Sequence, residues 1–126
     1  ATAGSMPGEA GLLPLAGSCV ASSSRLCLLD RRFAVTVDWR NQFNGSQGAG
    51  IPTRIRELTG AFAFTDRANL ETLIKILEFP DRFLVLYGAL SNLEYTFTLR
   101  DTVTGRTETY QNPAGRYCGG LDNSAF

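Results

Sequence analysis

Apolar and polar side chains alternate most regularly in two segments, residues 33–39 and 93–101. Large apolar residues occupy every second position from Phe33 to Trp39, and the same spacing recurs from Leu93 to Leu99. A two-residue period puts all of these side chains on one face of an extended chain. We therefore predict a half-buried β-strand in each segment, and the β-branched residues of the first support this.

Shorter segments separated by turn residues are also predicted to be strands. The run FLVLYGA at 83–89 is apolar at nearly every position, which is typical of a central strand covered on both faces. Pro52 favours an edge or a strand start, and a Thr-Gly turn within 102–106 predicts a hairpin. The composition of residues 41–50 predicts a long flexible loop. The predicted strands are 51–58, 60–64, 83–89 and 107–110.

Residues 69–78 fit two patterns. Leu70, Leu73, Ile74 and Leu77 have the spacing of a helical stripe, with Asp66 as a possible cap. The same residues also suit a strand that is apolar on both faces. The pattern alone leaves both structures open and slightly favours the helix.

The strands recur about every ten residues with turns between them, which is typical of an antiparallel sandwich. We predict an all-β antiparallel β-sandwich of about seven or eight strands over residues 19–126. Residues 1–18 are predicted to be an extended arm or linker, because Pro14 interrupts their apolar cluster of Leu12, Leu13 and Leu15. The predicted core comprises Phe33, Val35, Val37, Trp39, Ile55, Phe62, Phe64, Ile74, Ile76, Leu84, Leu86, Leu93, Tyr95, Phe97 and Leu99.

Composition narrows the classes of function. Of the 126 residues, 44% are apolar and 19% charged, which argues against disorder. Twelve basic and twelve acidic residues cancel, so charge gives no reason to expect a nucleic acid or an anionic membrane as the main partner. The chain has no histidine, which excludes histidine-dependent triads, dyads and zinc sites. We expect no cofactor and no metal.

The chain contains no apolar run long enough to span a membrane, so no membrane insertion is expected. The segment ATAGSMPGEAGLLPLAGS lacks the basic region of a signal peptide. It reads as a mature N-terminus left after cleavage, as an interdomain linker, or in part as a cloning remnant.

Three cysteines allow one disulfide and leave one thiol over. Cys19 and Cys27 flank a serine-rich segment that can turn and bring the two sulfurs together. We predict that they form a disulfide, with three buried free thiols in a cytosolic protein as the alternative. Cys118 would then be a buried small apolar residue or an intermolecular link.

Several sequence stretches together resemble a domain found at the C-terminal end of many predicted secreted bacterial proteins. They are RFAVTVDWR at 32–40, GAFAF at 60–64 followed by NLE at 69–71, FLVLYGALSNLEYTFTLRDTVTG at 83–105, YQNPAGRYCGG at 110–120 and DNSAF at 122–126. The resemblance covers about three-quarters of the chain. It implies a secreted β-sandwich and a strand at 69–78, because similar sequences are richer in valine there. Similar sequences place Trp between residues 60 and 64, where this chain has Ala and Phe.

Candidate catalytic and metal-binding residues do not form a motif. The carboxylates Asp38, Asp66, Glu71, Glu94 and Asp101 could serve glycoside hydrolysis, but we predict that they are solvated surface charges, with Glu94 and Asp101 on or beside an exposed strand face. Asp66 with Asn69 and Asp122 with Asn123 offer too few oxygens for calcium, and turn capping is the better interpretation.

Aromatic residues could form a platform for sugar rings. Trp39 and Tyr95 lie on the apolar sides of their predicted strands, so we predict that they pack in the core. Tyr110 and Tyr117 lie near turns and are the better candidates for a contact surface, together with Leu12, Leu13 and Leu15 of the arm.

Three hypotheses follow. The first is a non-catalytic, secreted structural or adhesive module at a bacterial surface, which could assemble with itself if the arm adds a strand to a neighbouring copy, or could bind a surface glycan or protein. The second is a carbohydrate-binding accessory domain of a secreted enzyme. The third is a small carboxylate-dependent hydrolase.

Overall fold

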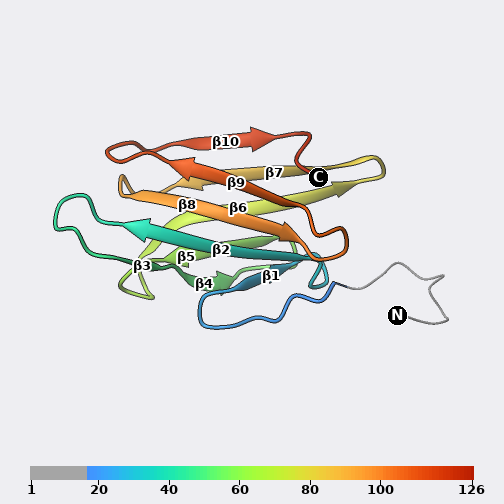
Figure 1. The fold of residues 1–126 in the computed structure, drawn as a ribbon, viewed down its shortest axis with the longest axis horizontal. Coiled ribbons are helices and arrows are strands. Elements are labelled where there is room, and N and C mark those ends of the chain that lie inside the picture. The colour runs from blue at the N-terminus through green and yellow to red at the C-terminus, as the bar shows by residue number, and fades with distance from the viewer. Residues whose placement is uncertain (1–16) are drawn as a thin grey trace.

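The computed structural model describes residues 17–126, which form two antiparallel β-sheets (Figure 1). This part of the chain contains ten strands and no helix, so the all-β prediction is confirmed and the predicted count of seven or eight strands is too low. Leu12, Leu13 and Leu15 of the predicted arm lie outside the described residues.

The first sheet, which we call the β2–β8 sheet, has the two alternating segments at its centre. Residues Phe33 to Arg40 pair antiparallel with residues Glu94 to Asp101 over their whole length. β1 and β3 both pair with the other side of β2, and β9 pairs with β8. The strands of this sheet are β1 (Leu26–Leu28), β2 (Phe33–Arg40), β3 (Gln47–Ala49), β8 (Glu94–Asp101) and β9 (Thr107–Asn112).

The second sheet, the β6–β7 sheet, has the order β10-β7-β6-β5-β4. Its centre is the long hairpin of β6 and β7, paired from Thr72↔Ala89 to Phe79↔Arg82. The segment predicted at 69–78 is therefore a strand, as the resemblance implied, and not a helix; the strand runs from Leu70 to Phe79. The strands of this sheet are β4 (Ile51–Arg54), β5 (Thr59–Ala63), β6 (Leu70–Phe79), β7 (Arg82–Ala89) and β10 (Gly119–Asp122).

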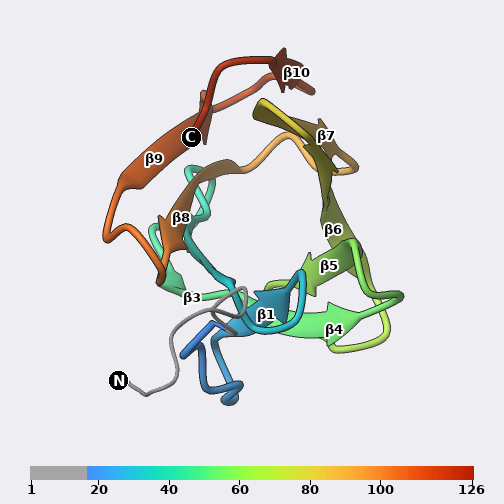
Figure 2. The same ribbon diagram turned by 90° about the vertical axis from the view of Figure 1, so that its right-hand side faces the viewer.

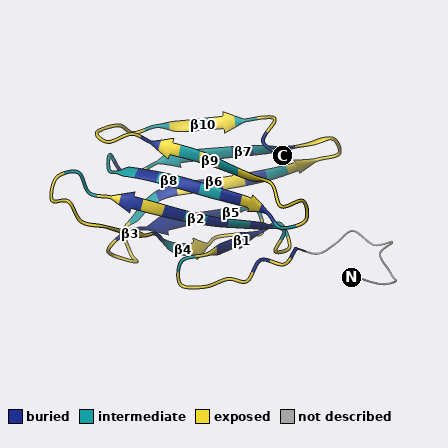
Figure 3. Ribbon diagram, in the orientation of Figure 1, coloured by how far each residue is buried: buried dark blue, intermediate teal, exposed yellow. Residues whose placement is uncertain are grey.

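The two sheets enclose one apolar core, and a view along the strands shows them as the two sides of a ring (Figure 2). They approach each other on one side where the Leu29 N–H donates to the Glu57 carbonyl at 3.0 Å. On the other side, the Tyr110 hydroxyl on β9 donates to the Asp122 carboxylate on β10 at 2.6 Å. Buried residues are concentrated on β2, β5 and β8, whereas β10 is largely exposed (Figure 3).

Aromatic rings fill much of the space between the sheets. Phe62 contacts Phe97 edge to face, and Trp39 stacks on Phe64 with a centroid distance of 5.6 Å. Such pairs add to the free energy gained from burying the rings. The predictions that Trp39 and Tyr95 pack in the core are confirmed, since their exposed fractions are 8% and 1%.

Some predicted element boundaries are wrong. The strand predicted at 51–58 ends at Arg54, because the N–H groups of Ile55 and Arg56 donate to the Thr59 carbonyl and close a turn. The loop predicted at 41–50 contains the short strand β3, and β1 and β10 were not predicted.

Three predicted core residues are not in the core. Ile55 is 48% exposed because it lies in the turn after β4. Val85 and Tyr87 of β7 pair with the buried Ile76 and Ile74 of β6, so the odd-numbered residues of β7 face the core. Leu84 and Leu86 therefore point outward. Leu93 is only half-buried but packs against the core.

Candidate interaction surfaces

The outer face of the β6–β7 sheet carries a group of leucines around the exposed Lys75, which pairs opposite Leu86. Adjacent strands place leucines opposite each other in the pairs Leu77↔Leu84 and Leu121↔Leu86, and Leu73 lies on the same face of β6. Leu121 is 62% exposed and Leu73 36% exposed. We call this set the leucine face: Leu73, Leu77, Leu84, Leu86 and Leu121. None of the described residues 17–126 forms a further layer over it (Figure 2).

The outer face of the β2–β8 sheet is polar. One row across three strands consists of Thr36, Thr98 and Thr109, and the next row contains Asp38 and Gln111. An antiparallel sheet with one solvated face has this alternation of apolar and polar residues. The leucine face, and not the polar face, is therefore the outer surface on which apolar side chains are exposed and would be stabilised by a binding partner.

The predicted disulfide is present and fastens the start of the described chain to β1. Cys19 and Cys27 are bonded, with their Cα atoms 5.8 Å apart. The N–H groups of Gly17 and Cys19 donate to the carbonyls of Asp30 and Arg31, at 3.3 and 3.0 Å. The segment 17–19 is thus held by covalent and hydrogen bonds against the turn between β1 and β2.

That turn has an uncommon backbone conformation. Leu29, Asp30 and Arg31 all have positive φ angles, of 53°, 52° and 63°. Side chains disfavour this left-handed region, so three consecutive residues in it are strained. Strain of this kind persists where the surrounding structure enforces it, and such residues gather at binding sites.

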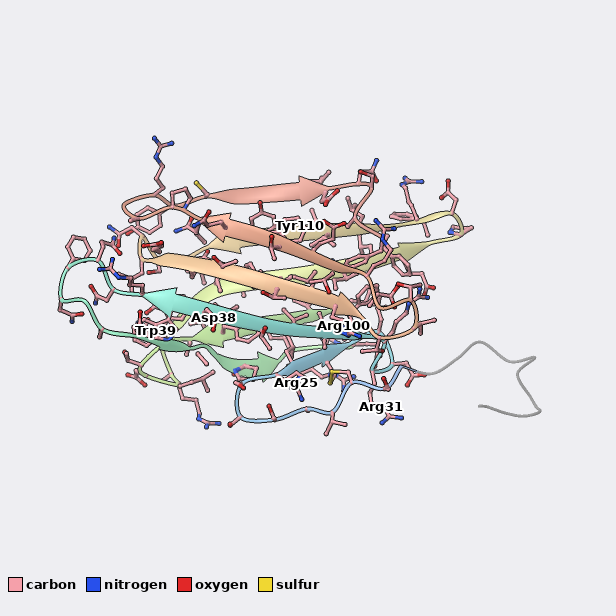
Figure 4. The ribbon with its side chains drawn as sticks, in the orientation of Figure 1. Arg25, Arg31, Asp38, Trp39, Arg100 and Tyr110 are labelled. Carbon is pink, nitrogen blue, oxygen red and sulfur yellow. A yellow bond between two sulfur atoms is a disulfide. The ribbon has the colours of Figure 1, made fainter. Side chains whose placement is uncertain are left out.

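A groove of about 260 Å³ lies beside the disulfide. Arg25, Arg31 and Arg54 line it, and none of the described residues in its lining is acidic. Figure 4 shows Arg25 and Arg31 on either side of the disulfide, at the edge formed by β1. The remaining lining residues are Ala21, Ser22, Leu26, Cys27 and Pro52.

A buried ion pair that the sequence did not reveal lies behind this turn. Arg32 donates two hydrogen bonds to the Asp101 carboxylate, at 3.0 and 2.8 Å, and Asp101 is 1% exposed. Burial pushes the pKa of Asp101 upward, but the bonds from Arg32 and from the Val103 N–H outweigh burial, and the pKa lies below its ordinary value. The prediction that Asp101 lies at an exposed face is therefore wrong.

The other candidate carboxylates are distributed over the surface. Glu94 lies 3.9 Å from Arg40 on the polar face, and Asp38 lies on the same face one strand away. Asp66 caps a turn, since its carboxylate accepts the Ala68 N–H at 2.9 Å. Among the described residues, no group of three or more Cys, Asp or Glu side chains could together hold a metal ion.

Tyr110 and Tyr117 differ in exposure. Tyr117 is 69% exposed, whereas Tyr110 is half-buried and its ring lies 5.0 Å from that of Tyr87. Burial and the hydrogen bond to Asp122 both raise the pKa of Tyr110, and the same bond lowers the pKa of Asp122. Tyr110 therefore joins the two sheets, and Tyr117 is the more accessible of the two.

Cys118 is a half-buried free thiol next to β10. Its N–H donates to the side-chain oxygen of Asn112, and its carbonyl accepts the Ala89 N–H. These bonds tie the end of β9 to β7 through the backbone of Cys118.

Comparison of the chain with protein-family models, with curated proteins and with solved structures finds no match. Over residues 17–126, no helix is long and apolar enough to cross a membrane.

Proposed function

We propose that this protein is a non-catalytic extracellular module with a structural or adhesive role, acting through its outer surfaces. The leucine face is the observation that carries the proposal. Its side chains lie on neighbouring strands and include Leu121 at 62% exposure. Exposed leucines gathered on one sheet face are typical of protein–protein contact sites, and Lys75 adds one charge within this group.

The disulfide and the small size of the domain agree with an extracellular location. Disulfides persist in oxidising compartments and are rare in the cytosol. The bond between Cys19 and Cys27 closes a loop of sequence separation 8 and packs against the core at the buried Cys27.

Self-association is the form of contact that we propose. A two-fold axis brings the same surface of two copies together, so two copies can bury their leucine faces against each other while the Lys75 ammonium extends to the edge of the contact. The polar face, with its threonines and charged residues, then stays in water. A surface protein of other origin would be the partner if the chain stays monomeric.

Light scattering on the purified full chain over a range of concentrations tests this proposal. We expect the wild-type protein to be dimeric or larger, and the double variant L73E/L121E to be monomeric, because two carboxylates would be buried in the contact. The matched control T107E/T109E adds two carboxylates to the exposed polar face and should keep the wild-type size. A wild-type monomer at every concentration would refute self-association.

Deletion of residues 1–16 distinguishes assembly through the leucine face from assembly through the N-terminal arm. The deletion keeps Gly17 and its hydrogen bond to Asp30. If assembly proceeds by addition of the arm to a neighbouring copy, the deletion will abolish it and L73E/L121E will not.

A carbohydrate-binding role is the second candidate, because Tyr117 presents an exposed ring in the loop between β9 and β10. A glycan array with the Tyr117→Ala variant as a control tests it. Binding that is absent, or that the variant retains in full, would remove Tyr117 from consideration.

A further inference from the structure

The groove beside the disulfide concentrates positive charge in a chain that has no net charge. Twelve basic and twelve acidic residues balance over the whole sequence, yet three of the eight residues in this lining are arginines. The local excess is therefore a property of this place in the fold. Arg54 is paired with Glu57, whereas Arg25 and Arg31 have no acidic partner among residues 17–126, so a bound anion would supply the counter-charge that these two lack.

The guanidinium groups of Arg25 and Arg54 are each held at the groove by a separate local contact. Arg25 closes a turn in which its N–H donates to the Ser22 hydroxyl at 3.1 Å, and its guanidinium donates to the Val20 carbonyl at 3.1 Å. Arg54 lies on the edge strand β4 and is oriented by its ion pair with Glu57.

Arg31 reaches the groove from the left-handed turn. Its backbone is fixed by the bond from the Cys19 N–H to its carbonyl, so the disulfide loop and this turn are held together. Within residues 17–126 no hydrogen bond or ion pair to the Arg31 guanidinium is found. It is therefore the arginine with the most donors available to a ligand.

The floor between the arginines is apolar. Leu26 is 3% exposed and Cys27 8% exposed, and Pro52 borders them from β4. A floor of this type can contact the C–H face of a sugar ring, while guanidinium groups bind a carboxylate or sulfate at the edge of the ring. A volume of about 260 Å³ suits one such ring.

We propose that the groove binds an acidic sugar unit, a hexose ring carrying a carboxylate or a sulfate, within an extracellular polysaccharide. Arg31 and Arg54 bind the anionic group, and Leu26 and Pro52 contact the ring. The groove lies at the β1 and β4 edges, and β4 and β10 are at opposite edges of the β6–β7 sheet. The proposal therefore does not depend on self-association through the leucine face.

Isothermal titration calorimetry of the full chain at low salt with three probes tests the proposal. The probes are a trimer of galacturonate, the corresponding neutral trimer of galactose, and sodium sulfate. We expect the galacturonate trimer to bind at least about tenfold more tightly than either of the others, because it alone offers both the anion and the ring. Equal affinity for sulfate and the trimer would overturn recognition of the sugar, and binding of none would overturn the site.

Arginine variants locate the binding. R31Q should weaken binding of the galacturonate trimer about tenfold, the loss of one charge-assisted hydrogen bond. Arg54 lies on a different element from Arg31, and R54Q should also weaken binding of the trimer. The test therefore does not depend on the folding of a single variant. The exposed Arg116 lies outside the groove lining, and R116Q should leave the affinity unchanged. Full affinity in R31Q and R54Q, or an equal loss in R116Q, would refute binding at the groove.

Discussion

Asp101→Asn measures how much of the stability depends on the buried ion pair with Arg32. The carboxylate accepts two bonds from the guanidinium and one from the Val103 N–H at 3.0 Å. An asparagine keeps the shape of the side chain but places an amide donor or a neutral oxygen against Arg32. The charge-assisted bonds are lost, and the guanidinium keeps no buried counter-charge.

The expected loss is about 3 kcal/mol of unfolding free energy, at the low end for breaking a buried ion pair. The low end applies because the Arg32 side chain is 26% exposed and can be hydrated again. It also stays over the Phe83 ring, 4.7 Å from the ring centroid. For a domain of this size, such a loss lowers Tm by about 10 °C.

The reverse variant, Arg32→Met, should cost more than Asp101→Asn. It leaves a carboxylate that is 1% exposed without a counter-charge, and a buried charge cannot be hydrated. Urea unfolding followed by circular dichroism gives both free energies. Asp38→Asn on the polar face is the control and should change stability by less than about 0.5 kcal/mol.

Acid titration gives an independent check. The pKa of Asp101 is lower in the folded state than its ordinary value of 3.8, so the unfolded chain binds the proton more readily. The stability that this carboxylate contributes is complete above the unfolded pKa and is lost as the pH falls through the folded pKa. Asp101→Asn should lose less stability than the wild type in that interval. A loss below about 1 kcal/mol at neutral pH, or equal acid sensitivity, would refute the reasoning.

Three further outcomes are expected. Replacing Cys19 and Cys27 together by alanine should lower the unfolding free energy by about 2.5 kcal/mol, because the unfolded chain gains the entropy of the short loop that the cross-link closes. The number of thiols that titrate in the native protein should be the same in the variant as in the wild type, since both sulfurs are bonded in the wild type. Phe62→Ala should cost about 3–5 kcal/mol in urea unfolding, because the ring is completely buried; a smaller loss would mean that the two sheets can close over the space. Tyr110→Phe should cost about 1 kcal/mol and raise the pKa of Asp122 toward its ordinary value in an NMR titration, because the hydroxyl is the main group that lowers that pKa; an unchanged Asp122 titration would contradict the bond.

The two alternating strands were predictable because each has one apolar and one polar side. The odd-numbered residues are buried in both strands, from Phe33 to Trp39 in β2 and from Tyr95 to Leu99 in β8, as a period of two requires. The same rule places Asp101 on the core side after Leu99. The exposed position predicted for this carboxylate is wrong, because the partner that stabilises it in the interior, Arg32, lies 69 residues away in sequence and no pattern links the two.

The strand β7 could not be oriented from the sequence, whereas Ile74 and Ile76 of β6 are in the core as predicted. Both sides of β7 are apolar, so a shift of one residue leaves its hydrophobic pattern nearly unchanged. Only the pairing with neighbouring strands places Val85 inside and Leu84 and Leu86 outside. The leucine face is not predictable for this reason, since Leu84 and Leu86 are expected in the core. The arginine groove is not predictable for another reason, because it joins residues from distant segments.

Weak strands escaped detection because glycine and polar residues dominate them. β10 has the sequence GGLD and β3 the sequence QGA, which are typical of turns. Pairing with β7 and β2 imposes the extended conformation on them.

The cross-link between Cys19 and Cys27 also determines how the domain would respond to mechanical tension. A pull on the chain before Gly17 reaches Cys19 and passes through the two sulfurs directly into β1, so residues 20–26 carry none of it. β1 in turn is paired with β2, the strand on which the whole first sheet is assembled. A tether attached at this end would therefore load the edge strand β1 directly and, through its hydrogen bonds, β2, without first straightening residues 20–26.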